Sequence, residues 1–384
     1  MAKSFDVIVA GVGAMGASAC WHLARRGLRV LGLERFSIPN AHGSSHGVNR
    51  IIRLAYFEHP SYVPLLRRAY ELWREAETAY GKRLLYITGG VDAGPRQGRL
   101  VTGSLASCRE HGLAHELIDA GELKRRYPAF SLPDDFVAVV QPDGGFLACE
   151  DAITAFAAMA RKHGAELREQ EPIVRWSATC GGVRVETANG TYQSGHLILS
   201  TGAWIADHAP QLNEIAVAER QVLGWFEPKE PKFFALGSLP ISILEVEEGL
   251  PYQFPVWGTP GFKIGLYRHR RESGAADTLQ RAPDQIDEQL LRNLVERYFP
   301  LAAGPTLRLE TCLFTNVPDG HFMIDRLPNA SNVIVASACS GHGFKFASVI
   351  GEILADLAMS NTPHFDLDFF KLRRFEINRA ARED

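Results

Sequence analysis

A glycine-rich segment near the N-terminus places the strongest constraint on how this chain folds. Residues 5–10 form a β-branched apolar run that is typical of a buried parallel strand. The segment Gly11-x-Gly13-x-x-Gly16 follows at once, and residues 14–26 have the composition of a helix. Residues 28–33 then form a second buried apolar strand. Together these parts predict a strand–turn–helix–strand unit.

Each glycine of the segment has its own role in binding a dinucleotide. Gly11 allows a tight turn, Gly13 lets the backbone approach a pyrophosphate, and Gly16 lets the helix pack closely on the strand. The helix N-terminus offers N–H groups and a partial positive charge to the phosphates. Glu34 ends the second strand, where a carboxylate can accept hydrogen bonds from ribose hydroxyls. The unit predicts a Rossmann-type dinucleotide site, and the motif alone does not choose between FAD and NAD.

Composition excludes several other classes of function. The formal net charge of −3 argues against binding to nucleic acid or to an anionic membrane. Six cysteines occur without a CxxC pair or a metal-ligand spacing, so we expect reduced thiols and no metal site. No apolar run reaches the roughly 18 residues that span a bilayer, and the apolar start of the chain is better explained as a strand than as a signal peptide. The expected compartment is the cytoplasm.

Length and element pattern predict two domains in an α/β fold. The 384 residues suffice for two domains of ordinary size. We expect a discontinuous dinucleotide-binding domain and a second, sheet-based substrate domain, an architecture like that of glutathione reductase or p-hydroxybenzoate hydroxylase. The first would comprise residues 1–85, 146–214 and 321–384, and the second residues 86–145 and the strand-rich, proline-rich stretch 215–320.

Four further segments resemble the family of monomeric sarcosine oxidase and N-methyltryptophan oxidase, and the resemblance extends over essentially the whole chain. The first is Gly-Ser-Ser-His-Gly-Val-Asn-Arg-Ile-Ile-Arg-Leu-Ala-Tyr at residues 43–56. The resemblance implies that Arg50 lies close to a flavin ring and that Arg53 binds the substrate carboxylate. A planar guanidinium can clamp a carboxylate with two hydrogen bonds, which a lysine cannot do.

The second segment is Gly-Phe-Lys-Ile-Gly-Leu-Tyr-Arg-His at residues 261–269. As a strand it would place Lys263, Tyr267 and His269 on one face. The resemblance implies that Lys263 promotes the reaction of the reduced flavin with oxygen. The family has a histidine where this chain has Tyr267, and His269 would lie about 7 Å further along the strand. The substitution puts both a catalytic histidine and sarcosine as the substrate in doubt.

The third segment contains Cys312 and the fourth is the loop at residues 340–345, Ser-Gly-His-Gly-Phe-Lys. The resemblance implies a thioether between Cys312 and FAD, which a thiolate nucleophile can form. It places the amides of the loop beside the pyrimidine end of the flavin and makes Lys345 a second cation for the substrate carboxylate.

The remaining expected site residues rest on the same resemblance. Tyr56 and Tyr252 match aromatic positions that line the family's substrate pocket. The expected cofactor contacts are Gly11, Gly13, Met15, Gly16, Glu34, Arg35, Ser44, Arg50, Ile173, Gly202, Trp204, Cys312, Gly341, His342, Gly343, Phe344 and Lys345.

These residues imply an oxidase of secondary amino acids. The substrate would be an N-methyl or N-alkyl amino acid, oxygen would be reduced to hydrogen peroxide, and the imine product would hydrolyse. The family further implies a monomer. Alternatives that the sequence leaves open are an oxidase of glycated or cyclic amino acids, a flavin dehydrogenase with another electron acceptor, a catalytically silent flavin-binding protein and a nicotinamide dehydrogenase.

Overall fold

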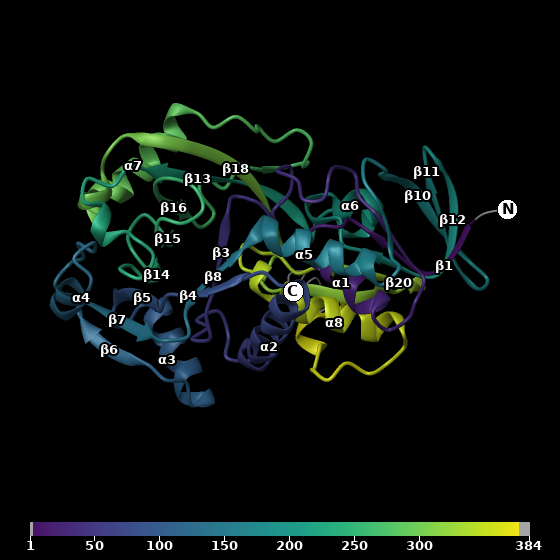
Figure 1. The fold of residues 1–384 in the computed structure, drawn as a ribbon, viewed down its shortest axis with the longest axis horizontal. Coiled ribbons are helices and arrows are strands. Elements are labelled where there is room, and N and C mark those ends of the chain that lie inside the picture. Colours follow the sequence, from purple (N-terminus) through teal and green to yellow (C-terminus); the bar gives the residue numbers. More distant parts are fainter. Residues whose placement is uncertain (1–2, 376–384) are drawn as a thin grey trace, which may run out of the picture.

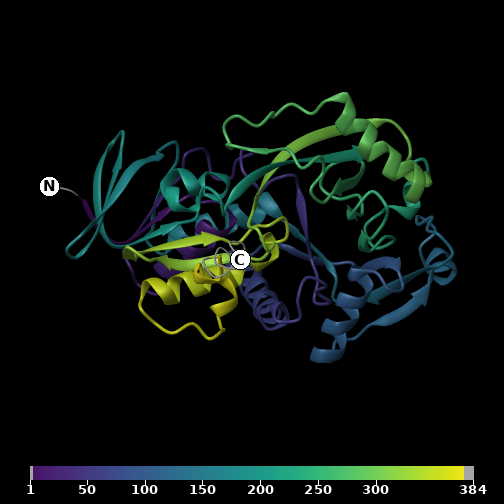
Figure 2. The same cartoon turned by 180° about the vertical axis from the view of Figure 1, so that it is seen from behind.

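The computed structural model describes residues 3–375 and shows two lobes lying side by side, seen from the front in Figure 1 and from behind in Figure 2. The first lobe contains an eight-stranded sheet whose central strands run parallel in the order β9-β2-β1-β12-β20. Its strands are Lys3–Ala10 (β1), Val30–Leu33 (β2), Glu166–Arg168 (β9), Ile173–Thr179 (β10), Gly182–Thr187 (β11), Gly190–Leu199 (β12), Met323–Leu327 (β19) and Ala330–Ser337 (β20).

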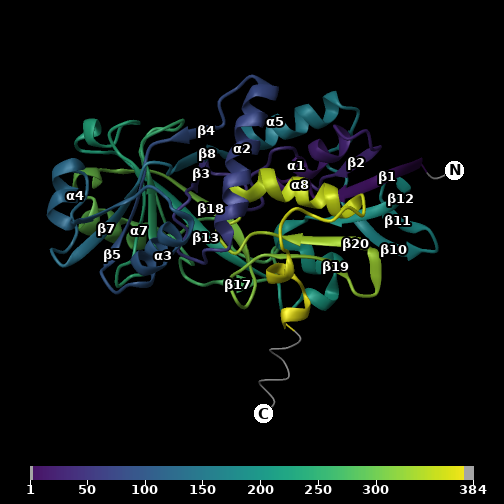
Figure 3. The ribbon, with the colours of Figure 1, turned by 90° about the horizontal axis from the view of Figure 1, so that it is seen from below.

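Three helices of this lobe pack against one another beside the sheet. Helix α1 (Ala14–Ala24) contacts both α5 (Cys149–Lys162) and α8 (Ala347–Ala358), and Figure 3 shows α1 and α8 running alongside one another. Gly351 permits this approach, because a Cβ there would lie 2.1 Å from the Ser18 hydroxyl oxygen. Helix α2 (Tyr62–Tyr80) packs on α5 and α8, and the short α6 (Ile205–His208) follows β12.

The second lobe is built on a nine-stranded sheet. The long strands β13 and β18 pair along their whole length, and helix α7 (Gln285–Tyr298) contacts β13 and β16. The strands are Gly90–Pro95 (β5), Glu116–Asp119 (β6), Phe136–Gln141 (β7), Val217–Phe226 (β13), Ile241–Leu244 (β14), Pro251–Phe254 (β15), Phe262–Leu266 (β16), Ser273–Gly274 (β17) and Thr306–Asn316 (β18).

A small sheet lies between the two lobes. It joins Asn49–Ile52 (β3), Leu85–Ile87 (β4) and Gly145–Ala148 (β8) in the order β3-β8-β4. Short 3-10 helices are found at Gly202–Trp204, Pro210–Leu212, Pro231–Phe233, Pro300–Ala302, Phe344–Phe346 and Asp368–Phe370.

The α/β fold with a Rossmann-type unit and a second sheet is confirmed. Every strand of the eight-stranded sheet falls within 1–85, 146–214 and 321–384, and every strand of the nine-stranded sheet falls within 86–145 and 215–320. Sheet membership supports the domain division, which stays a prediction. The two ends of the first predicted domain, residues 1–2 and 376–384, lie outside the described residues.

The strand-rich interpretation of the second lobe was incomplete. Residues 86–145 also contain α3 (Arg99–His111) and α4 (Ala120–Arg126), and residues 215–320 contain α7. Among residues 3–375, no helix has the length and apolar character needed to cross a membrane.

Candidate active site

A cavity of about 690 Å³ extends from the glycine-rich turn of the first lobe to the β15–β16 hairpin of the second. It is lined by all but two of the expected cofactor residues, the exceptions being Gly16 and Cys312. Arg53, Tyr252 and Tyr267 also line it, whereas Tyr56, Lys263 and His269 do not. The structure therefore gathers most of the expected site residues around one space.

The glycine-rich turn has the geometry that close backbone approach requires. Gly11 has φ +85°, and a Cβ there would lie 2.6 Å from the Ser200 carbonyl oxygen. A Cβ on Gly16 would lie 1.9 Å from the carbonyl oxygen of Gly11, so only glycine lets α1 pack against the turn. At Gly13 the nearest such neighbour, Ser45 Oγ, is 3.9 Å away, so its missing side chain opens space on the cavity side.

Glu34 lies on the cavity wall beside this turn. Its carboxylate accepts hydrogen bonds from the backbone N–H groups of Val12 (2.7 Å) and Phe36 (3.0 Å). Burial raises the pKa of Glu34, and the two N–H donors oppose that change. The indole of Trp204 and the guanidinium of Arg35 share the carboxylate of Asp277, at 2.7 and 3.1 Å.

Two buried hydroxyls on the same wall identify a place for a polar ligand. Thr201 and Ser337 line the cavity, and their hydroxyl oxygens are buried without a hydrogen-bond partner among the described residues. A buried hydroxyl without a partner is unfavourable, so a bound group is expected to satisfy it. These hydroxyls, the open space at Gly13 and the carboxylate of Glu34 fit the phosphates and ribose of FAD.

The loop at residues 340–345 closes the cavity at the start of α8. Ser340 and Gly341 adopt positive φ values of 43° and 77°. The His342 ring donates from Nε2 to the Gly320 carbonyl at 2.9 Å, so its Nδ1 accepts from the Tyr56 hydroxyl. Burial lowers the pKa of His342 to about 4, so this ring is neutral at pH 7.

Arg53 is already paired in the structure. Its guanidinium is buried and donates to both carboxylate oxygens of Glu58, at 3.1 and 2.9 Å, while its Nε has no partner among residues 3–375. The buried Asp92 carboxylate lies 4.0 Å away. Burial alone would raise the pKa of Glu58, but the Arg53 charge holds it below its usual value.

Lys345 supplies the second cation of the cavity. Its Nζ donates to the His342 carbonyl at 2.7 Å and lies 5.2 Å from the centre of the Tyr56 ring. Burial lowers the pKa of Lys345 to about 7. Tyr56 itself is fully buried beneath Arg53 and Lys345, so the expectation that it lines the pocket is wrong, and it supports the two cations instead.

Lys263 lies behind the cavity wall, close to Arg50. Its Nζ donates to the carbonyls of Gly47 (2.7 Å) and Asn49 (2.8 Å) and to the Asn49 side-chain oxygen (2.7 Å). Burial and the Arg50 charge lower the pKa of Lys263 well below its usual value. The three oxygen acceptors oppose this change and favour the charged form, because they match the three N–H donors of an ammonium, whereas a neutral amine has only two.

Comparison with known proteins identifies the family. The FAD dependent oxidoreductase family matches residues 6–357. The chain belongs to this family. The resemblance inferred from the sequence is confirmed: a monomeric sarcosine oxidase from Streptomyces avermitilis is 40% identical over 379 residues, which cover 97% of this chain and 98% of that protein. An N-methyl-L-tryptophan oxidase from Salmonella arizonae is 34% identical over 383 residues, covering 97% and 99%.

A solved structure agrees with the fold. The L-proline dehydrogenase from P. horikoshii superposes with a TM-score of 0.85 at 22% identity, covering 98% of this chain and 99% of that one. At this level of identity the likeness concerns the fold alone. The family match over residues 6–357 makes the chain an FAD-dependent oxidoreductase.

Two neighbouring cysteines lie at the cavity, one on its wall and one behind it. Cys312 is fully buried in a cluster with Leu223, Trp225 and Phe314, and Cys339 packs against that cluster and lines the cavity. Burial raises the pKa of the Cys312 thiol, while the Arg50 and Lys263 charges oppose that change.

The tyrosine that replaces the family's histidine contributes an aromatic wall. The Tyr267 hydroxyl donates to the Ser340 carbonyl at 3.1 Å, and its ring lies 5.9 Å from that of Phe314. A Cβ on Gly341 would lie 2.4 Å from the Tyr267 ring. Burial raises the pKa of Tyr267 to about 12, so it cannot act as a base near neutral pH.

The expectation that His269 shares the face of Lys263 and Tyr267 is wrong. Strand β16 ends at Leu266, and Arg268 has φ +57°, which breaks the alternation of a strand. His269 is instead buried against Asp287, with Nε2 3.0 Å from Oδ1. The histidine does not replace the one that the family carries at position 267.

Several residues of the cavity were missed from the sequence. Glu58 follows Arg53 by five positions in an irregular segment, so no periodic pattern connects the two. Asn316 and Arg268 line the cavity, but they are ordinary polar residues in the sequence and become notable only through their surroundings. Within residues 3–375, no group of three or more histidine, cysteine, aspartate or glutamate side chains is placed to hold a metal ion.

Proposed function

We propose that this FAD-dependent oxidoreductase oxidises a secondary amino acid, N-methyl or N-alkyl, at the carbon next to nitrogen, and transfers the electrons to oxygen. The observation that carries the proposal is the placement of Arg53 and Lys345 in the cavity that continues to the dinucleotide turn. The relatives named sarcosine oxidase and N-methyl-L-tryptophan oxidase support the same class of substrate.

The two cations would hold the carboxylate of the substrate. Arg53 is bound to Glu58 in the structure, so an entering carboxylate must compete with Glu58 or share the guanidinium through its unpartnered Nε. Lys345 lies close enough to Glu58 for the two charges to interact. A second carboxylate in this place would raise the pKa of Lys345 and keep its ammonium charged.

The amine would react as its neutral form. His342 donates to the Gly320 carbonyl and accepts from Tyr56, and Tyr267 donates to Ser340, so none of these side chains is available as a base near pH 7. The substrate therefore binds after losing its ammonium proton to solvent. The wall formed by Tyr252, Tyr267 and Phe314 excludes water and positions the carbon–hydrogen bond.

When bound, FAD would supply the redox chemistry, as the carrier of two electrons from the amine to oxygen. The amine becomes an imine, which water hydrolyses to an aldehyde and a primary amine where an N-methyl group was oxidised. Oxygen takes up two electrons and two protons and becomes hydrogen peroxide. We propose that Lys263, held charged by its three oxygen acceptors, stabilises negative charge as oxygen is reduced.

We also propose a thioether between Cys312 and FAD, a monomeric state and a cytoplasmic location. The monomeric state is supported by the name of the bacterial relative, monomeric sarcosine oxidase. Light scattering on the purified protein tests it. The thioether is tested below by comparing Cys312 with Cys339.

The experiment that tests the function is an aerobic peroxide assay over a panel of N-methyl, cyclic and glycated amino acids. Production of peroxide with N-methyl amino acids is the expected result. Turnover of cyclic or glycated substrates alone would replace the proposed substrate class. Turnover only with an artificial acceptor, and not with oxygen, would identify a dehydrogenase. Lys263→Met serves as a mechanistic control, because it should lower peroxide formation at least about 100-fold while flavin reduction persists.

A further inference from the structure

An arginine that the proposed reaction does not use lies on the cavity wall. Arg268 lines the cavity next to Tyr267, and its side chain is 43% exposed. Its backbone has φ +57°, which an arginine rarely adopts. Strained residues of this kind persist only where their surroundings hold them.

The side chain of Arg268 is fixed by a buried carboxylate. Its Nε and Nη2 donate to one oxygen of Glu219, at 3.1 and 3.0 Å, and Glu219 is only 1% exposed. The other Glu219 oxygen accepts from the Gln221 amide at 2.9 Å. This arrangement occupies one side of the guanidinium, and Nη1 makes no hydrogen bond to any described residue.

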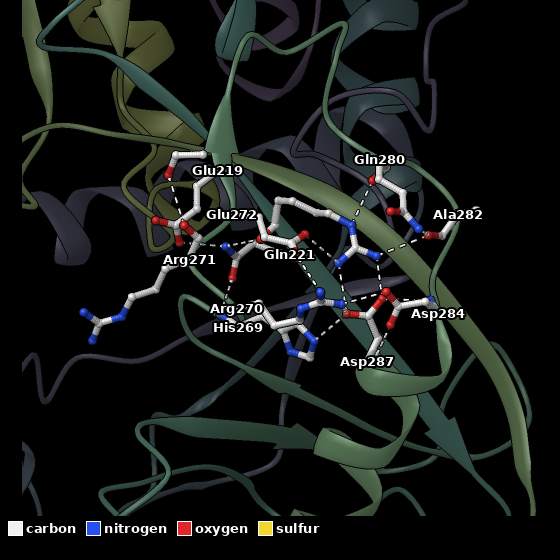
Figure 4. Close-up of polar contacts among 12 residues, drawn as sticks. Glu219, Gln221, His269, Arg270, Arg271, Glu272, Gln280, Ala282, Asp284 and Asp287 are labelled. Atoms are coloured by element: carbon white, nitrogen blue, oxygen red, sulfur yellow. Dashed lines mark hydrogen bonds and ion pairs between the residues drawn. The ribbon is translucent and has the colours of Figure 1, made fainter.

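The residue after Arg268 is also fixed by hydrogen bonds. Gln221 accepts from the His269 N–H at 3.2 Å, and the His269 ring is bound to Asp287, as the close-up in Figure 4 shows. Asp287 in turn binds both Nη atoms of Arg220, at 2.9 and 2.5 Å. The buried network therefore explains how Arg268 is kept in an unfavourable conformation at the cavity.

The side-chain amide of Asn316 lies on the same face of the nine-stranded sheet as Glu219. Strands β13 and β18 place Glu219 opposite Phe314 and Val217 opposite Asn316, so Glu219, Phe314 and Asn316 share one face. Asn316 lines the cavity, and both its Nδ2 and its Oδ1 are buried without a hydrogen-bond partner among residues 3–375. A buried amide of this kind is costly unless a ligand binds it.

We propose that Arg268 and Asn316 form a recognition site for a carboxylate on the side chain of the substrate. The inference rests on the proposed function and adds to it: the preferred substrates are N-alkyl amino acids with an acidic side chain. Arg53 and Lys345 suffice for the α-carboxylate, which leaves Arg268 for a second anion. Arg268 would donate through Nη1 and Asn316 through Nδ2, a pair of fixed donors that a carboxylate can accept from at once.

The test compares near-isosteric substrates. The ratio of kcat/KM for α-N-methyl-L-glutamate to that for α-N-methyl-L-glutamine should be about tenfold or more, because only the first carries the second charge. Arg268→Gln should bring this ratio close to one, and Asn316→Leu should lower it in the same direction. A measurement without turnover uses the flavin absorption band: glutarate should bind more tightly than butyrate, and Arg268→Gln should remove the difference.

Two further variants serve as controls. Arg271 is exposed and does not line the cavity, so Arg271→Gln should keep the ratio. Arg99 is another cavity arginine, and loss of the preference in Arg99→Gln but not in Arg268→Gln would overturn the assignment. Equal turnover of the two substrates by the unaltered enzyme would also overturn it, while leaving the proposed function intact. Failure of every secondary amino acid to reduce the flavin would instead contradict the proposed function.

Discussion

At the scale of single residues, binding of the substrate carboxylate is expected to depend on the protonation of Lys345. Burial holds its pKa at about 7, so the side chain changes charge near neutral pH. Below about pH 7 the ammonium is present before the substrate arrives. Above that pH, binding of an anion must be accompanied by uptake of a proton, and affinity falls.

The first prediction concerns a simple carboxylate that lacks an amine, such as propionate. Its Kd, measured from the flavin absorption band, should be constant below about pH 7 and should rise by up to about tenfold per pH unit above it. Lys345→Met should bind more weakly at low pH and lose the pH dependence. A Kd that is constant from about pH 6 to 9 in the unaltered protein would show that Lys345 does not contribute to anion binding.

Arg53 is a poorer choice for such a test, because it has a structural role as well. Its removal would leave Glu58 and Asp92 buried without their common partner. Breaking a buried pair in this way costs about 3–5 kcal/mol. We expect Arg53→Ala to lower the thermal midpoint of unfolding as well as to raise KM, and Arg53→Lys to recover part of the stability but little of the affinity.

A further residue-scale prediction tests the proposed thioether between Cys312 and FAD. Cys312→Ser should release FAD on acid precipitation and leave a colourless pellet, whereas Cys339→Ser should leave a yellow one. Cys339 is the stringent control, because it packs against the cluster of Cys312 and lines the cavity. Release of FAD from Cys339→Ser alone would transfer the proposed attachment to Cys339.

The residue types of the site could be predicted from the sequence far better than their partners. Arg53, Lys345 and Tyr252 line the cavity as the resemblance implied. The pairing of Arg53 with Glu58 could not be predicted, since it depends on the path of an irregular segment. His269 was misplaced because no sequence pattern announces a positive φ at an arginine.

At the scale of elements, the loop between β20 and α8 is tightly constrained at Gly341. Gly341 combines φ +77° with a Cβ position that lies 2.4 Å from the Tyr267 ring and 2.6 Å from the Phe314 ring. A side chain there would therefore strain the backbone and move the aromatic wall of the cavity.

Gly341→Ala should destabilise the protein by about 1–2 kcal/mol through its backbone and should in addition raise KM by displacing Tyr267. Gly81 offers a matched control, because it has φ +79° at the end of α2 with no atom within 4 Å of an added Cβ. Gly81→Ala should destabilise the protein by a similar amount and leave KM unchanged. Equal kinetic effects of the two substitutions would contradict this interpretation of the loop.

Local patterns predicted the elements well where a single period dominates. The helix expected over residues 14–26 is found at Ala14–Ala24, and the strands expected over 5–10 and 28–33 are found at Lys3–Ala10 and Val30–Leu33. Helix α7 was missed, although it begins with a capping box in which Asp284 and Asp287 bind one another's backbone N–H groups. Prolines and short apolar runs around it obscured this local signal.

At the scale of the whole molecule, the fold brings distant segments to one cavity. The glycine-rich turn comes from the N-terminus, the two cations are residues 53 and 345, and the aromatic wall comes from β15, β18 and the residue that follows β16. The two-lobed α/β arrangement could be predicted from the glycine-rich unit and the family resemblance. The depth of the cavity and the burial of Lys263 could not be predicted from the sequence, because they depend on how the two sheets meet.

The central claim is that one cavity holds a flavin beside a pair of cations that bind an amino acid carboxylate. Anaerobic mixing with a panel of N-methyl-L-amino acids, followed at about 450 nm, tests it most directly. We predict that at least one of these amino acids bleaches the flavin. The amine that has the same skeleton but lacks the carboxylate should bleach it far more slowly. Air should restore the colour and yield one hydrogen peroxide per flavin. A flavin that stays oxidised with every secondary amino acid, or that is bleached equally well without the carboxylate, would contradict the account.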